Sequence, residues 1–249
     1  MNRTFADKVA LVTGAAGGIG EAVAVELASG GAAVLVVDVQ FDKAELVAQA
    51  IRETGGRALA FRADVSSAGE SEAAVRKAEQ EFGSLHLAVN NAGISGRFAA
   101  LPEIEPEEWR RVLGVNLDGV YHGMRAQLPA IERCGGGAIV NIGSIYGHLG
   151  LRRLDAYTAS KHAVIGMTRS VAIEYATRGI RVNCVSPGPI LTPLTRGSKE
   201  QTDPIAAQTA MKRMGEAIEI AKAVAFLLSG DASFIVGAEI VVDGGVMLA

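Results

Sequence analysis

Short apolar runs alternate along the chain with longer segments in which apolar residues recur at helical spacing. Each run is rich in Val, Ile, Leu and Ala and is bounded by Gly, Asp, Asn or Pro. Several runs show no polar alternation, which is typical of strands buried on both faces of a parallel sheet. The predicted strands are Lys8–Thr13, Ala33–Asp38, Ala58–Asp64, Leu85–Asn90, Gly137–Gly143, Ile180–Ser186 and Glu239–Asp243.

The segments between these runs are rich in Ala, Glu, Lys and Arg and predict helices. Strands that alternate with helices of this length indicate a doubly wound α/β fold of the Rossmann type, with about seven parallel strands and helices on both faces. No composition shift marks a linker, so we expect a single domain over residues 1–249. The predicted helices are Glu21–Ser29, Lys43–Thr54, Glu70–Phe82, Pro106–Arg133, Tyr157–Arg178 and Ile218–Leu228.

Composition narrows the class of partner. Hydrophobic residues make up 49% of the 249 residues, enough for a large core, and the net charge of −3 gives no electrostatic reason to expect nucleic acid. No apolar run approaches the roughly 20 residues that span a bilayer, and Met1–Lys8 lacks the apolar segment of a signal peptide. We therefore expect a cytoplasmic protein without a membrane segment.

The two cysteines, Cys134 and Cys184, lie far apart in the sequence and in no metal-ligand spacing. We interpret them as reduced thiols and expect no metal site, although the sequence leaves a disulfide open.

The segment Thr13-Gly14-Ala15-Ala16-Gly17-Gly18-Ile19-Gly20 joins the first predicted strand to the first predicted helix. Glycines allow a tight turn and a close approach to a pyrophosphate, and the helix N-terminus supplies free N–H groups. The spacing is G-x-x-x-G-x-G, not the commoner G-x-G-x-x-G. Such a cluster alone also fits an ordinary turn between a strand and a helix.

Asp38 at the end of the second predicted strand favours the cofactor interpretation. A carboxylate at this place accepts hydrogen bonds from the adenosine ribose and repels a 2′-phosphate. No Lys or Arg lies in the glycine segment, and Val39 and Gln40 follow the acid, so we predict NAD and not NADP. The alternative is that Asp38 only caps a turn.

Further polar residues follow two other predicted strands, where open α/β sheets bind their ligands. Asp64, followed by Val65, ends the third strand, and its carboxylate is a candidate partner for the adenine amino group. Asn90-Asn91-Ala92-Gly93 ends the fourth. The two asparagines also fit a purely structural turn.

Tyr157 and Lys161 stand four residues apart in a predicted helix and therefore share one face. A phenol with a pKa near 10 is a poor acid or base at neutral pH, and an adjacent ammonium is expected to lower that pKa. The spacing also occurs by chance in helices. Ser144 strengthens the case, because it follows the fifth strand, where its hydroxyl can donate to a substrate carbonyl; its alternative role is a cap.

Asn116 is a fourth candidate. It shares a helix face with Trp109, Val112, Leu113 and Val120, so we expect it to point inward and to find partners there. The amide either ties down a bent helix or takes part in a proton relay that links Lys161 to solvent, and both roles stay open.

These residues resemble the short-chain dehydrogenase/reductase family, in its branch of about 250 residues, over essentially the whole chain. The resemblance is carried by Thr13-Gly14-x-x-x-Gly18-x-Gly20, Asp64, Asn90-Asn91-Ala92-Gly93, Asn116, Ser144, Tyr157, Lys161 and Pro187-Gly188, all in the family's order.

The resemblance implies a role for each of these positions. Tyr157 would be the general acid/base, Ser144 would position the substrate oxygen, Lys161 would lower the pKa of Tyr157 and bind the nicotinamide ribose, and Asn116 would anchor a water relay. Ile190 and Thr192 match positions that hold the nicotinamide carboxamide. The expected cofactor site comprises Gly14, Gly18, Ile19, Gly20, Asp38, Asp64, Val65, Asn91, Ala92, Gly93, Tyr157, Lys161, Pro187, Gly188, Ile190 and Thr192.

The resemblance also implies hydride transfer between NAD and a secondary alcohol or ketone, and a homotetramer. Residues 190–214 resemble the family's substrate loop; its mixed composition favours an apolar or cyclic alcohol. Arg152 and Arg153 are candidates to recognise an anionic group on the substrate, or are simply solvated.

Two alternatives stay open. One is a 3-oxoacyl-(acyl-carrier-protein) reductase, opposed by Asp38 and by Ile173, which stands where such reductases often carry a basic residue. The other is a regulator that binds NAD without turnover, opposed by the complete set of Ser144, Tyr157 and Lys161.

Overall fold

A computed structural model describes residues 4–192, 195 and 199–248. At its centre is a seven-stranded parallel sheet in the order β3-β2-β1-β4-β5-β6-β9, which confirms the predicted fold class. Each observed strand lies within two residues of its predicted bounds at either end. The strands are β1 (Val9–Thr13), β2 (Ala33–Asp38), β3 (Arg57–Arg62), β4 (Leu87–Asn90), β5 (Gly137–Ile142), β6 (Ile180–Pro187) and β9 (Glu239–Val242).

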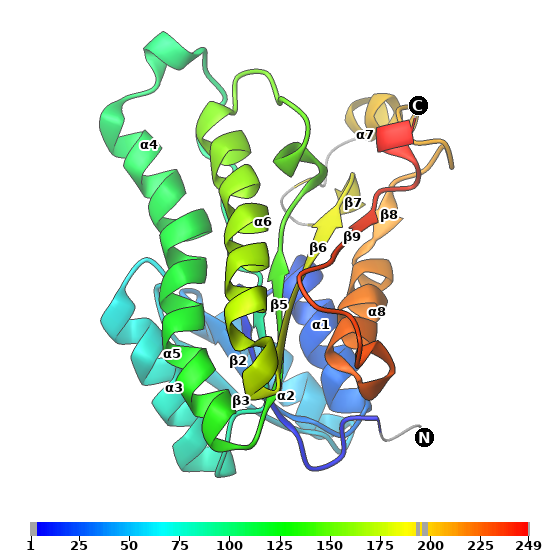
Figure 1. The fold of residues 1–249 in the computed structure, drawn as a ribbon. Helices are drawn as coiled ribbons and strands as arrows, with labels where there is room; N and C mark the ends of the chain where they lie inside the picture. Colours follow the sequence, from blue (N-terminus) through cyan, green and yellow to red (C-terminus); the bar gives the residue numbers. More distant parts are fainter. Residues whose placement is uncertain (1–3, 193–194, 196–198, 249) are drawn as a thin grey trace.

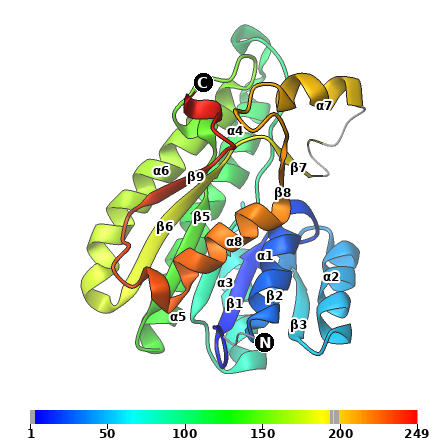
Figure 2. The same ribbon diagram turned by 90° about the vertical axis from the view of Figure 1, so that its right-hand side faces the viewer.

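Helices cover both faces of the sheet (Figures 1 and 2). One face packs against α1 (Gly18–Ser29), α2 (Phe41–Glu53) and α8 (Ala217–Leu228). The other packs against α3 (Ala68–Phe82), α5 (Gly119–Arg133) and α6 (Asp155–Tyr175). Strand residues alternate between the two cores, so Val12 and Val34 face one layer of helices while Leu11 and Leu35 face the other. Burial on both faces explains why the sequence runs lack polar alternation.

The prediction of one continuous helix over 106–133 is wrong in one respect: a wider, π-helical turn interrupts the helix. The chain forms α4 (Pro106–Leu113), a π-helical turn η2 (Gly114–Asp118) and then α5. The Gly119 N–H donates to the Gly114 carbonyl, five residues back, which marks one residue more than an α-helical turn holds. Asn116 lies in the middle of this turn.

Small elements above the carboxyl ends of β6 and β9 were not predicted. The two-residue strands β7 (Ile190–Leu191) and β8 (Gly215–Glu216) pair in parallel at the base of the segment that contains α7 (Lys199–Ala206). The helix predicted over Tyr157–Arg178 ends at Tyr175 in the structure, and Ala176–Arg178 form a 3₁₀ turn. Both cysteines are free thiols. In the described part of the chain no helix has the length and apolarity needed to cross a membrane.

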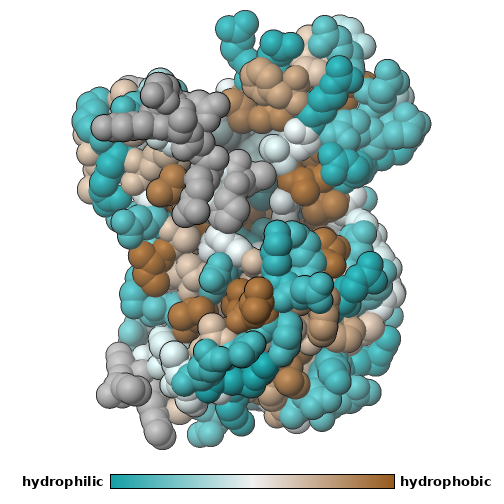
Figure 3. Space-filling view, turned by 180° about the vertical axis from the view of Figure 1, so that it is seen from behind, coloured by the Kyte–Doolittle hydropathy of each residue, from teal (hydrophilic) through white to brown (hydrophobic). Residues whose placement is uncertain are grey.

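Figure 3 shows the face opposite to that of Figure 1, which carries α1, α2 and α8. Apolar and polar side chains are interspersed over it. Phe226 of α8, Phe41 of α2 and Val25 of α1 are among the exposed apolar residues, each between 42% and 44% exposed.

Candidate active site

The glycine segment forms a tight turn between β1 and α1, held by Asn91. Gly14 has φ 63°, and a Cβ on Gly20 would lie 2.2 Å from the Gly14 carbonyl oxygen, so both positions require glycine. The Asn91 Nδ2 donates to the carbonyl oxygens of Thr13 and Gly14, each at 2.9 Å. The predicted cofactor residue Asn91 therefore shapes the turn with its side chain, which agrees with the structural interpretation of that residue.

The turn delivers the chain to the N-terminus of α1. Gly17 is the N-cap and supplies no side-chain cap, so the first N–H groups of the helix, near Gly18 and Ile19, point out of its end without a side-chain acceptor. This donor set at a helix N-terminus fits the pyrophosphate of a dinucleotide.

Asp38 reaches from the end of β2 to this turn. Its side chain is 9% exposed; Oδ2 accepts a hydrogen bond from the Ala16 N–H at 3.0 Å, and Oδ1 accepts one from the Gln40 N–H at 2.9 Å. The carboxylate therefore does cap a turn, but it also lies against the glycine segment. A ribose hydroxyl bound there meets a fixed acceptor, and a phosphate meets a negative charge.

Asp64 lies two residues beyond β3. Its Oδ1 accepts hydrogen bonds from the N–H and the hydroxyl of Ser66, and its backbone N–H donates to Glu70. The following Val65 is 9% exposed, and its carbonyl contacts the His122 ring nitrogen Nδ1 at 3.2 Å. One carboxylate oxygen of Asp64 thus serves the local turn.

Ser144, Tyr157 and Lys161 come together at the carboxyl end of β5. Ser144 lies close enough to the Tyr157 phenol to lower its pKa, and the Ser144 Oγ accepts from the Tyr146 N–H at 3.2 Å. Lys161 Nζ lies 5.7 Å from the centroid of the Tyr157 ring and donates to the Ile142 carbonyl at 2.8 Å. The predicted constellation is therefore present, and Ser144 has both its capping role and its predicted neighbour.

Burial shifts the pKa of each ionisable member. Desolvation raises the pKa of Tyr157 above its ordinary value, and the hydrogen bond from Ser144 opposes that rise. Desolvation also lowers the pKa of Lys161 to about 8. The expected lowering of the Tyr157 pKa by Lys161 is thus not found in the protein alone, because the loss of water outweighs an ammonium that faces the Ile142 carbonyl.

Asn116 is fully buried, as predicted, and its partners are protein atoms. Its Oδ1 accepts from the Ile94 N–H at 2.8 Å, and its Nδ2 donates to the Ile94 carbonyl at 2.9 Å and to the Ser160 Oγ at 3.1 Å. Ser160 in turn donates to the Tyr157 carbonyl at 2.7 Å. Asn116 therefore ties the segment after β4 to the helix that carries Tyr157.

The segment after β4 borders the lysine. A Cβ on Gly93 would lie 3.7 Å from Lys161 Nζ and 3.4 Å from the Asn116 Oδ1, so the exposed Gly93 borders the buried ammonium. Gly93 thus lies between the glycine segment after β1 and the group of Ser144, Tyr157 and Lys161.

The remaining predicted cofactor residues lie after β6. Pro187 ends that strand, and Gly188 packs against the backbone of Asp243, where a Cβ would come within 2.6 Å. Ile190 is 5% exposed, and the Thr192 N–H donates to the Thr195 hydroxyl at 3.0 Å. Parts of the predicted substrate loop, residues 193–194 and 196–198, lie outside the described residues.

Comparisons with known proteins agree along the whole chain. A family model described as "Enoyl-(Acyl carrier protein) reductase" matches residues 14–247. A cyclohexanol dehydrogenase from Acinetobacter sp. (strain SE19) is 45% identical over 244 residues, 98% of this chain and 96% of that protein. A cis-4-hydroxycyclohexanecarboxylate dehydrogenase from Sinomonas cyclohexanicum is 45% identical over 246 residues, 98% of each chain. The crystal structure of levodione reductase matches with a TM-score of 0.91 at 38% identity, covering 97% of this chain and 98% of that one.

The chain belongs to the short-chain dehydrogenase/reductase family. It is therefore an oxidoreductase that acts on CH–OH groups with a nicotinamide cofactor. The resemblance inferred from the sequence motifs is confirmed, and so is the enzyme class.

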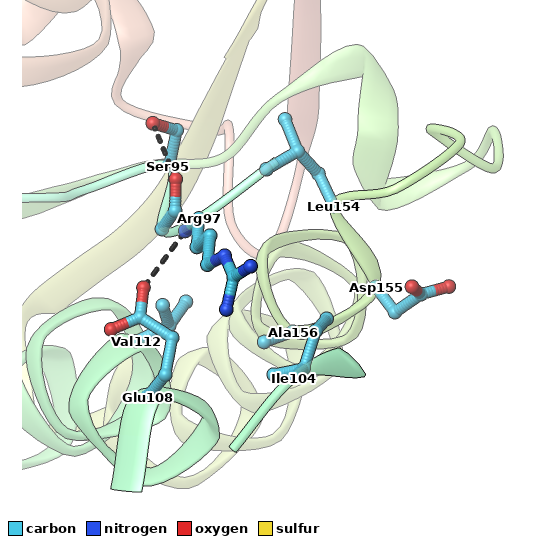
Figure 4. A pocket seen from close by; sticks show the side chains of 9 residues that line it. Ser95, Arg97, Ile104, Glu108, Val112, Leu154, Asp155 and Ala156 are labelled. Carbon is cyan, nitrogen blue, oxygen red and sulfur yellow. Dashed lines mark hydrogen bonds between the residues drawn. The ribbon is translucent and has the colours of Figure 1, made fainter. Parts of the chain in front are cut away.

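Sequence reasoning missed some of the residues that shape this short-chain dehydrogenase site. Glu108 of α4 accepts from the Arg97 N–H at 2.8 Å and is itself held by Arg111 through two hydrogen bonds. Arg97 and Glu108 border a small pocket of about 10 Å³ between α4 and the start of α6, where the Asp155 carboxylate points away from them (Figure 4). Two charged residues on the α4 surface and one arginine in the segment after β4 form no sequence pattern that distinguishes them from solvated charges.

The two candidate arginines of this short-chain dehydrogenase lie on an exposed loop before α6. The Arg153 guanidinium stacks over the Phe98 ring at 5.0 Å from its centroid, and the Arg153 carbonyl accepts from the Ala99 N–H at 3.1 Å. Arg153 also has φ 66°, uncommon for a residue other than glycine. Arg152 is exposed as well. The loops before α6 and after β4 are thus joined at Arg153.

Proposed function

We propose that the protein is an NAD-dependent dehydrogenase of cyclic secondary alcohols. The observation that carries this proposal is the contact of Ser144 with Tyr157, with Lys161 beside them, at the edge of the sheet where the helix α1 N-terminus and Asp38 lie. The catalytic set is Asn116, Ser144, Tyr157 and Lys161, with Asn116 acting on the other three through the backbone.

The side chains divide the work of alcohol oxidation. The Ser144 hydroxyl donates a hydrogen bond to the substrate oxygen, and the Tyr157 Oη accepts the hydroxyl proton of the alcohol. Lys161 supplies a positive charge near the ring, which favours the phenolate. A nicotinamide held at this site would supply the acceptor for the hydride of the carbinol carbon. In ketone reduction the Tyr157 phenol returns the proton.

Asn116 supports this chemistry by position. Its amide is committed to Ile94 and Ser160, so it fixes the segment that borders Lys161 and the first turn of α6. A water relay from Lys161 past Asn116 requires that the bond to Ile94 be shared with water, and we keep that relay as a proposal.

Asp38 supports NAD as the cofactor. Its carboxylate is fixed by the Ala16 and Gln40 N–H groups beside the glycine segment, which supports a role in binding the hydroxyls of the adenosine ribose. A 2′-phosphate on that ribose would face a negative charge that cannot turn away.

The relatives support the cyclic alcohol. Two proteins that are 45% identical to this chain are named for cyclohexanol and cis-4-hydroxycyclohexanecarboxylate, both alicyclic secondary alcohols. The mixed apolar and charged composition of residues 190–214 fits such a substrate better than a highly polar one.

A homotetramer is also part of this proposal. β9 is an edge strand of the sheet; its own Val241 is exposed, and so are Val236 and Phe234 shortly before it in the chain, Phe234 fully. An open edge with apolar neighbours favours burial against a second copy. Light scattering coupled to gel filtration tests the assembly; a monomer at micromolar concentration would refute it.

The function is tested by NADH formation with a panel of secondary alcohols, diols, sugars, steroids and hydroxyacyl thioesters. We expect turnover with cyclohexanol-type substrates and its loss in Tyr157→Phe, while NAD binding by calorimetry is kept. Turnover only with the thioesters would favour the acyl-carrier-protein reductase, and NAD binding without any turnover would favour the regulator. Tyr121→Phe, at an exposed tyrosine of α5, is the matched control.

A further inference from the structure

A closed group of polar side chains lies in the core between the sheet and the helices α5 and α6. Asn90, Gln127, Asn141 and Thr168 are each at most 3% exposed. Asn90 Nδ2 donates to the Asn141 Oδ1 at 2.9 Å and to the Gln127 Oε1 at 3.1 Å, and Gln127 returns a bond to the Asn90 Oδ1 at 2.8 Å. Asn141 Nδ2 donates to the Thr168 Oγ1 at 2.9 Å. We call these residues the amide network.

Each member of the amide network comes from a different element, and each of those elements carries part of the site. Asn90 ends β4 and directly precedes Asn91. Asn141 lies on β5, three residues before Ser144. Thr168 lies on α6, two helical turns after Lys161. Gln127 lies on α5, the helix that follows the π-helical turn with Asn116.

Every side-chain nitrogen and oxygen of the network has at least one hydrogen-bond partner. Thr168 donates its hydroxyl to the Val164 carbonyl at 2.8 Å, and the second Asn141 N–H faces the Met124 sulfur at 3.4 Å. Among the described residues no buried side-chain nitrogen or oxygen lacks a partner. Gly123 allows the close approach, since a Cβ there would lie 2.5 Å from the Asn90 Oδ1.

Such a network restricts the sliding of a helix over a sheet, which apolar packing alone permits. Apolar contacts tolerate small sliding of a helix over a sheet, whereas a buried amide that loses its partner incurs the full cost of desolvation. The bond from Asn141 to Thr168 therefore fixes the register of α6 against β5. That register sets the separation of Ser144, on the β5 side, from Tyr157 and Lys161 on α6.

We propose that the amide network is a positioning device for the reaction, in which Asn141 and Thr168 hold Tyr157 in register with Ser144. The proposal rests on the proposed function. None of the four side chains is placed to touch substrate or cofactor, so their effect passes through the backbone of β5 and α6.

Asn141→Ala and its control Asn183→Ala test the proposal. Both asparagines are completely buried and lie on neighbouring central strands, but Asn183 binds only the Ile235 carbonyl and the Ala238 N–H, outside the network. We expect both variants to lose thermal stability, and only Asn141→Ala to lose about tenfold or more in kcat, because small displacements of reacting groups cost that much. Its KM for NAD should change little.

The deuterium isotope effect separates positioning from general loosening. With an alcohol deuterated at the carbinol carbon, the isotope effect on kcat should rise in Asn141→Ala, since hydride transfer becomes slower than product release, and stay at the wild-type value in Asn183→Ala. Thr168→Val, which removes one hydroxyl, should act in the same direction, and Thr168→Ser should restore the wild-type rate. Equal kcat losses in the two alanine variants, measured well below both unfolding temperatures, would overturn the proposal.

A second measurement does not depend on turnover. Amide hydrogen exchange in peptides that cover residues 155–165 should accelerate in Asn141→Ala and Thr168→Val but not in Asn183→Ala. Unchanged exchange there would also refute the network's role. If wild-type enzyme oxidises no alcohol in the panel while exchange changes as expected, the proposed substrate is wrong and the positioning inference stands.

Discussion

Lys161 donates from its Nζ to the carbonyl oxygen of Ile142 at 2.8 Å, which fastens the catalytic helix to the strand that carries Ser144. This bond leaves a cation inside the protein with a neutral acceptor. Burial lowers the pKa of Lys161 from 10.5 to about 8, so the protein holds the ammonium at a cost to its own stability.

We predict that Lys161→Met unfolds at a higher temperature than the wild-type protein at pH 7 when no cofactor is bound. Between pH 8 and 10.5 the unfolded chain binds more protons at this position than the folded one, so the penalty is complete below pH 8 and fades as the pH rises. The difference in pKa corresponds to about 3 kcal/mol. Lost bonding to Ile142 offsets part of it.

Calorimetry at pH 7 and at pH 9 checks this prediction. The advantage of Lys161→Met should shrink at pH 9. Cys184, whose pKa burial raises to about 11, destabilises the fold of both proteins as the pH rises above 9, so the two are compared at the same pH. An advantage that is the same at both pH values would contradict the assigned cause.

The second prediction concerns Asp38. Asp38→Ala should weaken NAD binding about tenfold, through loss of a charge-assisted hydrogen bond. The affinity for NADP should rise toward the affinity for NAD. Calorimetric titration with both cofactors measures it. Asp38→Asn, which keeps an acceptor for the Ala16 N–H, should retain the turn but lose the repulsion. Equal affinities for both cofactors before and after the change would refute the role.

Asn91 supplies the third prediction. In Asn91→Asp the group that donates to the Thr13 and Gly14 carbonyls becomes an acceptor facing two acceptors, so we expect a loss of about 2–4 kcal/mol in unfolding free energy and weaker NAD binding. Asn91→Ala should cost less, because it removes the bonds without repulsion. Urea unfolding of the two variants checks the order, and a more stable Asn91→Asp would contradict the donor role.

The fourth prediction tests Arg153 as a recognition residue for a negatively charged substrate. If its guanidinium, stacked on Phe98, binds an anionic group, Arg153→Ala should raise KM for 4-hydroxycyclohexanecarboxylate and leave KM for cyclohexanol unchanged. Arg152→Ala on the same exposed loop is the control. An unchanged KM for both alcohols would remove Arg153 from the site.

The fold could be predicted from the sequence because its signal is repeated. The central strands are mostly apolar runs, since both faces of the sheet are covered, and each ends at, or within two residues of, a Gly, Asp or Asn. The members of the candidate site could be predicted for the same reason: Ser144 follows a strand, and Tyr157 and Lys161 share a helix face. Their proximity in space follows from the topology.

Other parts of the site could not be predicted, because they depend on contacts between distant residues. Nothing near Gln127 or Thr168 in the sequence indicates that they meet Asn90 and Asn141 in the core. The pKa of Tyr157 depends on how much water its surroundings exclude, which local spacing does not record. The π-helical turn at 114–118 could not be predicted either, since the residues at both of its ends have ordinary helical dihedral angles.

Because of the π-helical turn at 114–118, the number of residues between α4 and α5 determines how the two helices are oriented. One added residue rotates everything before it by about 100° relative to α5. A deletion of any one residue in 114–118 would let α4 and α5 merge into a regular helix, and the apolar stripe of α4 would then swing off the body of the protein. We therefore expect substitutions along α4 to impair the enzyme less than the deletion of one residue from 114–118. The number of residues between Val112 and Val120 thus helps to determine the geometry of the site.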